Sequence, residues 1–201
     1  MTASLWVKIC GMTSAAGIAA AADVGADAVG FVFYPPSPRN LSVAQAIDLQ
    51  AAVPARVRRV AVFLHPAPTL VAEVLAHVRP DCLQLDLEDI AALDLPETVE
   101  CLPVVRSGAL PARLPERILL ESARSGHGER ADWTQARELG GRHEVVLAGG
   151  LDADNVGLAI ATARPFGVDV SSGVESARGI KSPALIDRFV TTARRAASAS
   201  Q

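Results

Sequence analysis

The chain has few aromatic residues, few cysteines and no large excess of either charge. Aromatics make up 4% of its 201 residues, which disfavours a β-sandwich built on aromatic cross-strand pairs. Cys10, Cys82 and Cys101 are widely spaced and form no CxxC pair, so neither a disulfide framework nor a zinc site is indicated. Because the net charge is −3 and no basic stripe is present, nucleic acid is not an expected partner.

Targeting and membrane-spanning segments are also not indicated. The first ten residues have neither a charged region nor the long apolar run of a signal peptide. The most apolar stretch, residues 15–35, is interrupted by Asp23, Gly25 and Asp27, unlike a transmembrane helix. We therefore expect a cytoplasmic protein that has no membrane partner.

Short aliphatic runs alternate with segments of helical period along the whole chain. Strands are predicted at 5–9, 27–33, 57–64, 82–85, 100–105, 117–121, 145–148 and 166–170, and helices at 14–24, 42–53, 68–77, 88–93, 132–139, 152–163 and 183–197. Repeated strand–helix units imply right-handed crossovers and a parallel sheet. An open doubly wound sheet is the alternative, but Gly11 alone does not supply the glycine-rich fingerprint that such a sheet has after its first strand.

Eight strand–helix units fit a closed (β/α)₈ barrel. The sequence therefore predicts an α/β fold, a single compact TIM barrel over residues 1–201. Its fourth and fifth helices are expected to be shortened, because residues 110–115 leave little room for a helix.

The seventh and eighth predicted strands are followed by loops rich in small residues. These loops contain Gly149, Gly150, Ser171, Ser172 and Gly173. Glycine lets a backbone approach an anion closely, and a following helix N-terminus favours negative charge. The same two loops form the recurrent phosphate site of (β/α)₈ barrels, so we predict a phosphate site here rather than two simple turns.

Cys10 directly follows the first predicted strand, next to Gly11 and the start of a helix. Such a position is expected to lower the pKa of the Cys10 thiol, which makes Cys10 a candidate base or nucleophile. The alternative is a core cysteine. Cys82 and Cys101 lie within or at the start of predicted strands and are expected to be core residues.

Glu121 ends the aliphatic run 118–120 at the end of the sixth predicted strand. Charged side chains seldom occupy such positions without a function, and a partly desolvated glutamate can donate a proton near neutral pH. Glu121 is therefore the candidate acid. The alternative is a surface glutamate that pairs with Arg124.

Three further groups of polar residues have open interpretations. Arg39 follows three prolines that can hold it over the barrel mouth to bind an anion, or it is a solvated loop residue. Asp86 follows the fourth predicted strand, and it is interpreted either as a catalytic residue or as a simple loop residue. The histidines show no metal-ligand spacing, so no metal is predicted and all four are interpreted as surface or loop residues: His65, His77, His127 and His143.

Four segments together resemble the phosphoribosylanthranilate isomerase family of tryptophan biosynthesis. They are VKICGMT (7–13), GADAVGFVFYPPSPRNLS (25–42), LAGGLDADN (147–155) and RPFGVDVSSGVE (164–175). The resemblance implies a (β/α)₈ barrel without a cofactor. It also implies an Amadori rearrangement of N-(5-phosphoribosyl)anthranilate to 1-(2-carboxyphenylamino)-1-deoxyribulose 5-phosphate.

The resemblance also implies roles for the candidate residues. Cys10 is the base, Glu121 stands at the position of the general acid, Arg39 lies near the anthranilate carboxylate and Asp169 near the sugar or amine. The two glycine- and serine-rich loops hold the phosphate. One acid and one base suffice for this reaction, so a phosphosugar is the expected small-molecule partner, and a monomer is expected rather than an oligomer.

The sequence departs from the family pattern on the acid side of the site. The family usually has Asp at the position of Glu121, and Gln-Leu-His-Gly where this chain has residues 84–87 (QLDL). Its glycine-rich loop after the sixth strand survives only in part, at 125–128. The longer Glu121 side chain moves the carboxyl by about 1.5 Å, and a displacement of about that size can cost roughly 10²-fold in rate.

These departures leave an alternative function, a degenerate barrel that binds a phosphosugar with weak or redirected activity. Two related barrel enzymes fit less well. Indole-glycerol-phosphate synthase needs a lysine at the barrel mouth, and neither Lys8 within the first strand nor Lys181 beyond the eighth is placed for that role. A bifunctional histidine and tryptophan isomerase is expected to show a repeated half-barrel, which this sequence lacks.

Overall fold

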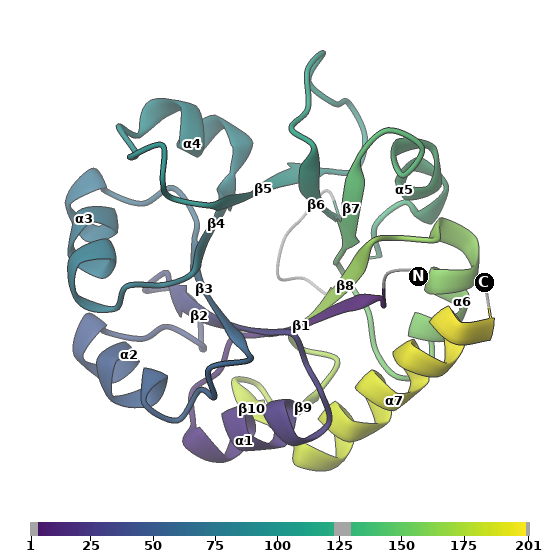
Figure 1. The fold of residues 1–201 in the computed structure, drawn as a ribbon, viewed down its shortest axis with the longest axis horizontal. Coiled ribbons are helices and arrows are strands. Elements are labelled where there is room, and N and C mark those ends of the chain that lie inside the picture. Colours follow the sequence, from purple (N-terminus) through teal and green to yellow (C-terminus); the bar gives the residue numbers. More distant parts are fainter. Residues whose placement is uncertain (1–3, 123–129, 200–201) are drawn as a thin grey trace.

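The computed structural model describes residues 4–122 and 130–199, and its eight long strands close into a parallel barrel in chain order. Figure 1 looks down this ring, with the helices arranged outside it. The strands are β1 (Trp6–Cys10), β2 (Ala28–Phe33), β3 (Arg58–Phe63), β4 (Cys82–Asp86), β5 (Cys101–Arg106), β6 (Arg117–Glu121), β7 (Glu144–Leu147) and β8 (Gly167–Val170). The predicted fold class, an α/β TIM barrel, is confirmed.

The helices follow the predicted order. They are α1 (Ala15–Asp23), α2 (Val43–Gln50), α3 (Pro68–His77), α4 (Leu87–Ala92), α5 (Trp133–Leu139), α6 (Val156–Ala163) and α7 (Pro183–Ala199). The helix after β4 is short, as predicted, and residues 107–116 between β5 and β6 contain no helix. Within the described ranges, no helix is long and apolar enough to cross a membrane.

One pair of strands was not predicted. β9 (Glu175–Ala177) and β10 (Ile180–Lys181) form an antiparallel hairpin after β8. Strands of three and two residues are too short to show a periodic pattern, so no local signal predicts them.

The helix expected from residue 152 begins instead at Val156. Asp152 Oδ1 accepts hydrogen bonds from the backbone N–H groups of Asp154 and Asn155, and Asn155 Oδ1 accepts one from the N–H of Asp152. These side-chain bonds replace the first helical turn with a loop. The residues between β7 and α6 are therefore available to form part of a binding site.

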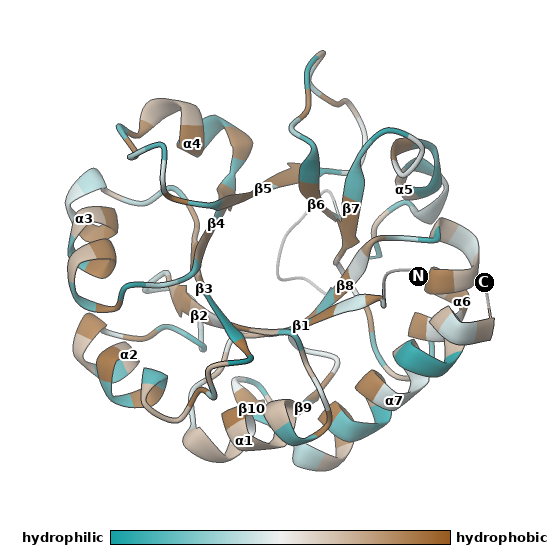
Figure 2. Ribbon diagram, in the orientation of Figure 1, coloured by the Kyte–Doolittle hydropathy of each residue, from teal (hydrophilic) through white to brown (hydrophobic). Residues whose placement is uncertain are grey.

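The barrel has an outer and an inner apolar layer. The outer layer packs the strands against the helices, and α7 shows the alternating hydrophilic and hydrophobic colours of an amphipathic helix in Figure 2. The inner layer comes from β2 to β7 and from the residue after β7: Ala28, Val60, Cys82, Leu102, Val104, Leu119, Val146 and Ala148. As predicted, Cys82 is a core residue, while Cys101 is half-buried.

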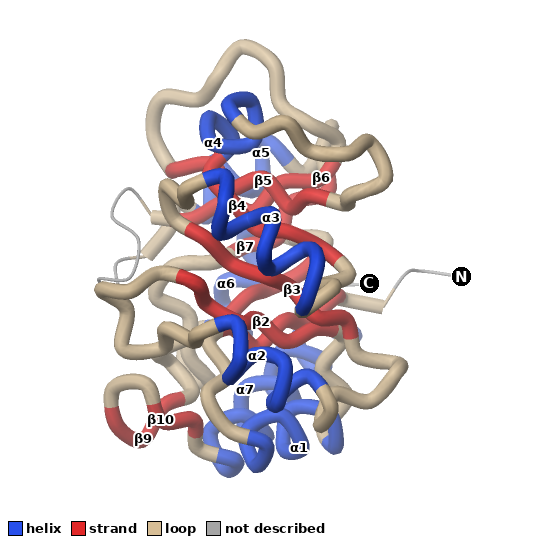
Figure 3. Tube along the Cα trace, turned by 90° about the vertical axis from the view of Figure 1, so that its left-hand side faces the viewer, coloured by secondary structure: helices blue, strands red, loops and turns tan. Residues whose placement is uncertain are grey.

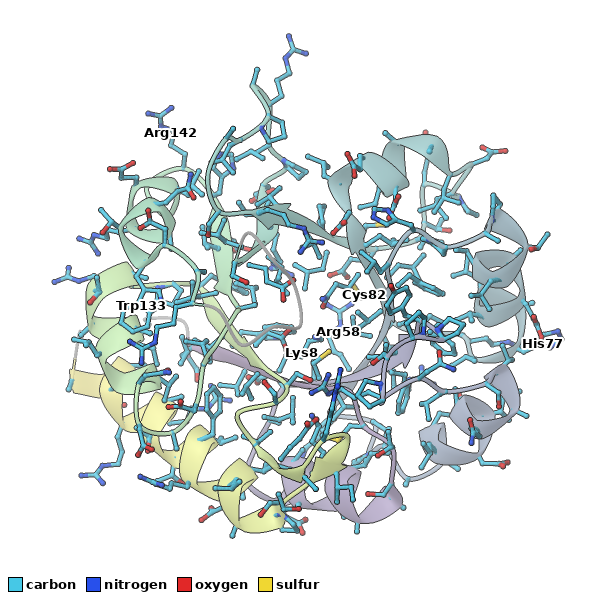
Figure 4. The ribbon with its side chains drawn as sticks, turned by 180° about the vertical axis from the view of Figure 1, so that it is seen from behind. Lys8, Arg58, His77, Cys82, Trp133 and Arg142 are labelled. Carbon is cyan, nitrogen blue, oxygen red and sulfur yellow. The ribbon has the colours of Figure 1, made fainter. Side chains whose placement is uncertain are left out.

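At β1 the interior is polar rather than aliphatic. Side chains alternate between the two faces of a strand. Val7 and Ile9 belong to the outer layer, so Lys8 and Cys10 face the interior. Figure 4 shows Lys8 near the middle of the ring, whereas His77 and Arg142 lie at its periphery. The barrel interior therefore carries polar side chains next to its aliphatic layer.

The two ends of the barrel are distinguished in side view. The chain termini lie on one side and the β9–β10 hairpin protrudes on the other (Figure 3). Since this hairpin follows β8, its side is the end at which the strands finish. Cys10, Asp86 and Glu121 are the last residues of their strands, so the parallel sheet brings them to this same end.

Candidate active site

The carboxyl ends of the strands surround a pocket of about 440 Å³, a size typical of small-molecule sites. Eight of the nine predicted site residues line it: Cys10, Arg39, Glu121, Gly149, Gly150, Asp169, Ser171 and Ser172. Asp86 and Arg106 line it as well. The exception is Gly173, which is outside the lining and packs against the neighbouring loop.

Lys8, Cys10 and Asp169 form one buried cluster at the base of this pocket. Lys8 and Asp169 are paired in the register of β1 with β8, and Lys8 Nζ lies 2.9 Å from Asp169 Oδ1. The Cys10 thiol and the Lys8 chain both pass over Gly30. A Cβ at Gly30 would lie 2.9 Å from Cys10 Sγ and 3.3 Å from Lys8 Cε. Gly30 therefore provides the space in which these two side chains meet.

The expected lowering of the Cys10 pKa is wrong for this structure. Burial raises the pKa of Cys10, and the nearby Lys8 and Lys181 ammonium groups oppose this rise without cancelling it. The sequence argument used the position of Cys10 at a strand end but not its depth, and only 7% of the residue is exposed. A thiolate formed here is less abundant, and more basic, than at an ordinary cysteine.

The Lys8–Asp169 pair keeps a charged amine inside the barrel. Burial by itself disfavours the ammonium form, but the carboxylate of Asp169 outweighs it and raises the pKa of Lys8. Cys10 accepts a hydrogen bond from the same amine, which favours its thiolate form. Lys8 is therefore the positive group that faces Cys10 directly.

On the other wall of the pocket, Arg106 bridges two carboxylates. Its Nη2 atom lies 2.6 Å and 2.8 Å from the two carboxylate oxygens of Asp86, and its Nη1 lies 3.3 Å from Glu121 Oε2. The Glu121 carboxylate is thus directed toward the pocket. The proposed partner Arg124, the loop 125–128 and His127 lie outside the described residues.

Arg39 reaches the pocket across Gly11 but is already bound on one side. Its Nε and Nη2 atoms lie 2.7 Å and 2.9 Å from the two carboxylate oxygens of Glu175, which also accepts from Lys181 Nζ at 2.8 Å. Although burial acts in the opposite direction, these cations lower the pKa of Glu175 to about 2. Arg39 is therefore a fixed cation rather than a solvated loop residue.

The two small-residue loops meet above β7 and β8. Gly149 and Gly150 have φ angles of 85° and 60°, which favour glycine. The backbone N–H groups of Gly149, Gly150 and Ser172 donate no hydrogen bond to another described residue. These N–H groups are thus available to an anion, which is the chemistry that a phosphate site needs.

Gly173, which was predicted to bind phosphate, instead lies where the two loops pack together. A Cβ on it would lie 2.0 Å from the carbonyl oxygen of Leu151 and 3.0 Å from Asp152 Cα. Because both contacts are with backbone, Gly173 lets the loops after β7 and β8 approach each other. It shapes the anion site without lining the pocket.

Substituting Gly173→Ala is expected to separate these loops and raise the KM for a phosphorylated substrate by about tenfold, with a smaller change in kcat. Steady-state kinetics with inorganic phosphate as a competitor measures both effects. Gly157→Ala is the matched control, because a Cβ there meets side-chain atoms only at 3.8 Å and 3.9 Å. Unchanged phosphate inhibition in the Gly173→Ala variant would contradict this role.

The residues that sequence reasoning missed are charged groups inside strands or beyond the last strand. Lys8 lies within a predicted strand, Arg106 directly follows the strand predicted at 100–105, and Lys181 and Glu175 belong to the unpredicted hairpin. The usable signal was a charge at an inward position of an aliphatic strand, as at Lys8 between Val7 and Ile9.

One cluster of possible metal ligands occurs among the described residues. His65, Asp86 and Glu88 each place one ligand atom within 4.8 Å of the others. However, both oxygens of Asp86 accept from Arg106, and His65 Nδ1 is 3.1 Å from Asp89 Oδ1. These partners compete with any metal ion, and we assign no metal site here.

The family model and the curated relatives indicate one family. The family model described as N-(5′-phosphoribosyl)anthranilate (PRA) isomerase matches residues 7–192. The N-(5′-phosphoribosyl)anthranilate isomerase of Bordetella petrii is 39% identical, covering 94% of this chain and 95% of that protein. The corresponding protein of Paracoccus denitrificans is 40% identical, covering 93% and 96%.

Solved structures give the same result. Phosphoribosyl anthranilate isomerase from Thermotoga maritima superposes with a TM-score of 0.83 at 32% identity, over 95% of this chain and 99% of that one. A phosphoribosyl anthranilate isomerase in complex with reduced 1-(o-carboxyphenylamino)-1-deoxyribulose 5-phosphate has a TM-score of 0.79 at 30% identity, with the same coverage.

Proposed function

Since the chain belongs to the N-(5′-phosphoribosyl)anthranilate isomerase family, we propose that it rearranges its phosphosugar substrate with Cys10 as the base and Glu121 as the acid. The protein is a phosphoribosylanthranilate isomerase of tryptophan biosynthesis.

The reaction needs two proton transfers on the sugar. Glu121 gives a proton to the ring oxygen, the bond between this oxygen and C1 breaks, and the open chain forms a Schiff base with the anthranilate nitrogen. The Cys10 thiolate then removes the proton from C2, and the electron pair forms the enolamine. Tautomerisation of the enolamine moves the proton of its C2 hydroxyl to C1 and gives the ketone. Proton exchange with solvent then returns Glu121 to its acid form and Cys10 to its thiolate form, so the cycle has no net gain or loss of protons.

The order of the strands around the barrel carries this proposal. β7 and β8 lie between β6, which ends at Glu121, and β1, which ends at Cys10. The loops with available N–H groups follow these two middle strands. A phosphate held there would anchor the sugar between acid and base, and such anchoring is a large part of the catalytic effect.

The remaining pocket residues fit the other groups of the substrate. We propose that Arg39 Nη1, the nitrogen that Glu175 does not bind, attracts the anthranilate carboxylate. Asp169 lies beside Cys10 at the pocket base, where the C2 hydroxyl or the amine would pass. Neither role requires a cofactor.

Substituting Glu121→Gln keeps the size of the side chain but removes its acid proton, so kcat is expected to fall about 10²- to 10⁴-fold. Glu121→Asp keeps the carboxyl and is expected to retain far more activity. A fluorescence assay of the loss of N-(5-phosphoribosyl)anthranilate measures both, with Glu144→Gln at the opposite barrel end as the matched control. A Glu121→Gln enzyme of wild-type rate would exclude the acid role.

The same assay tests the alternative of a degenerate barrel. If the wild-type protein binds reduced 1-(o-carboxyphenylamino)-1-deoxyribulose 5-phosphate but does not turn the substrate over, binding without catalysis is the better description. We favour catalysis, because Cys10, Glu121 and the anion loops open on one pocket.

We also propose a cytoplasmic monomer. Among the described residues, the exposed large hydrophobic side chains are Ile47, Leu158 and Ile180, on three different elements. Scattered single residues of this kind do not form the apolar patch that a stable dimer buries. A relative from Thermotoga maritima is described as dimeric, and sedimentation at about twice the 20.9 kDa chain mass would overturn the monomer.

A further inference from the structure

Three charged side chains from three adjacent strands meet on one wall of the pocket. Asp86 ends β4, Arg106 ends β5 and Glu121 ends β6, and Arg106 is paired with Glu121 in the strand register. All three line the pocket. Asp86 and Glu121 are the two carboxylates on this wall, and Arg106 contacts both of them.

Arg106 holds its two partners unequally. Both carboxylate oxygens of Asp86 lie within 2.8 Å of Arg106 Nη2, whereas Glu121 Oε2 is 3.3 Å from Nη1. The planar guanidinium fixes the directions of its N–H groups. Asp86 therefore orients Arg106, and Arg106 presents its other terminal nitrogen, Nη1, to Glu121.

A catalytic acid must be held in place and must still carry its proton. A lone guanidinium beside Glu121 would favour the ionised carboxylate, which cannot donate. With Asp86 on the same guanidinium, most of the positive charge is balanced and the hydrogen bond to Glu121 remains. The arrangement can thus orient the acid without forcing it to lose its proton.

We propose that Arg106, held and charge-balanced by Asp86, is the positioning residue for the acid Glu121. This inference rests on the proposed acid role of Glu121. It explains how the longer Glu121 side chain is seated: Arg106 fixes the extra torsion that the added methylene introduces.

Among the described residues, further charged groups lie close to Asp86. His65, from the loop after β3, and Glu88, on α4, each have a ligand atom within 4.8 Å of Asp86. His65 is mostly exposed and pairs with Asp89, which raises the pKa of His65. His65→Gln is therefore a necessary control for any pH measurement on this wall.

The pH dependence of kcat/KM separates positioning from a structural role. Turnover requires enzyme in which Glu121 is protonated and Cys10 is ionised. Below the pKa of Glu121 both groups hold a proton, so the fraction of enzyme in this active state falls, and kcat/KM falls with it along an acid limb. Asp86→Asn leaves the charge of Arg106 unbalanced and is expected to move this acid limb down by about one pH unit and lower the plateau about tenfold.

Arg106→Gln has the opposite effect on the limb. It leaves the Asp86 carboxylate facing Glu121 without a cation, so the acid limb is expected to move up by about one pH unit. The kcat is expected to fall about 10- to 10²-fold, because the acid is no longer oriented. Arg106→Lys keeps the positive charge but loses the fixed N–H directions of the planar guanidinium. It should return the acid limb to its wild-type pH and restore part of kcat.

The controls make each failure distinct. Arg117→Gln breaks a comparable pair with Glu144 at the other end of the barrel and should change neither kcat nor the limb. If Glu121→Gln is inactive but Asp86→Asn and Arg106→Gln keep the wild-type limb, the positioning proposal is wrong and the acid role stands. If Glu121→Gln is fully active, the proposed function itself fails.

Discussion

Substituting Cys10→Ala is expected to lower kcat/KM about 10³-fold, because it removes the thiolate proposed as the base for C2, and the neighbouring carboxylate of Asp169 is held by Lys8. Binding of reduced 1-(o-carboxyphenylamino)-1-deoxyribulose 5-phosphate should stay within a few-fold of wild type, since phosphate binding is assigned to the loops after β7 and β8. Steady-state turnover and titration calorimetry on the same preparation measure the two effects.

Cys101→Ser is the matched control for this substitution. Cys101 is half-buried at the start of β5, at the other end of its strand from the pocket. It should have wild-type turnover. Because burial raises the pKa of Cys10 above its ordinary value of 9.0, the alkaline limb of the wild-type profile is expected above pH 9. Turnover by Cys10→Ala at the wild-type rate would show that Cys10 is a core residue only.

Substituting Lys8→Met is expected to lower the free energy of unfolding by about 3–5 kcal/mol at pH 7, because Asp169 loses its partner inside the barrel. The Lys8 side chain has no exposed surface, and its Nζ is 2.9 Å from Asp169. Turnover should also fall, since Lys8 supplies the positive charge that favours the Cys10 thiolate. Urea unfolding and kinetics at one temperature measure both losses.

The pH dependence of this stability loss follows from the sign of the shift. Burial raises the pKa of Asp169 against the opposing effect of Lys8, and removal of Lys8 raises it further, so the folded variant binds a proton more tightly than its unfolded chain does. The loss should therefore be small near pH 4 and grow toward pH 7. A loss that is the same at both pH values would point to packing rather than to charge.

A second substitution separates the effect of Lys8 on stability from its effect on turnover. In Lys8→Met with Asp169→Asn, the unpaired carboxylate is gone, so most of the lost stability should return. The activity should not, because the amine beside Cys10 is still absent. If the double variant recovered turnover together with stability, the electrostatic role of Lys8 toward Cys10 would be wrong.

Several parts of the site were predictable because they depend only on chain order. In a parallel barrel every strand ends on the same side, so a residue that ends a strand reaches the same rim as the others. Cys10 and Glu121 could be placed together in this way, although they are 111 positions apart in the printed sequence. The glycines after β7 were equally predictable from the sequence, because their contribution depends on local positive φ angles.

Other parts depended on distances between strands, which no local pattern contains. The pairing of Lys8 with Asp169 follows from the register of β1 with β8, and that of Arg106 with Asp86 and Glu121 from the closure of β4, β5 and β6. The role of Gly173 became visible only where two loops approach within contact distance. The direction of the Cys10 pKa shift likewise depends on how deeply the thiol is buried in the barrel, which only the tertiary structure shows.

The sequence by itself determined the alternation of strands and helices, hence the barrel, and the identity of the residues at its rim. Only the tertiary structure decided which charges neutralise one another there. The physical reason is that secondary structure follows from local periodicity, whereas an ion pair depends on the position of two side chains that closure of the sheet alone brings within 3 Å, as for Lys8 and Asp169.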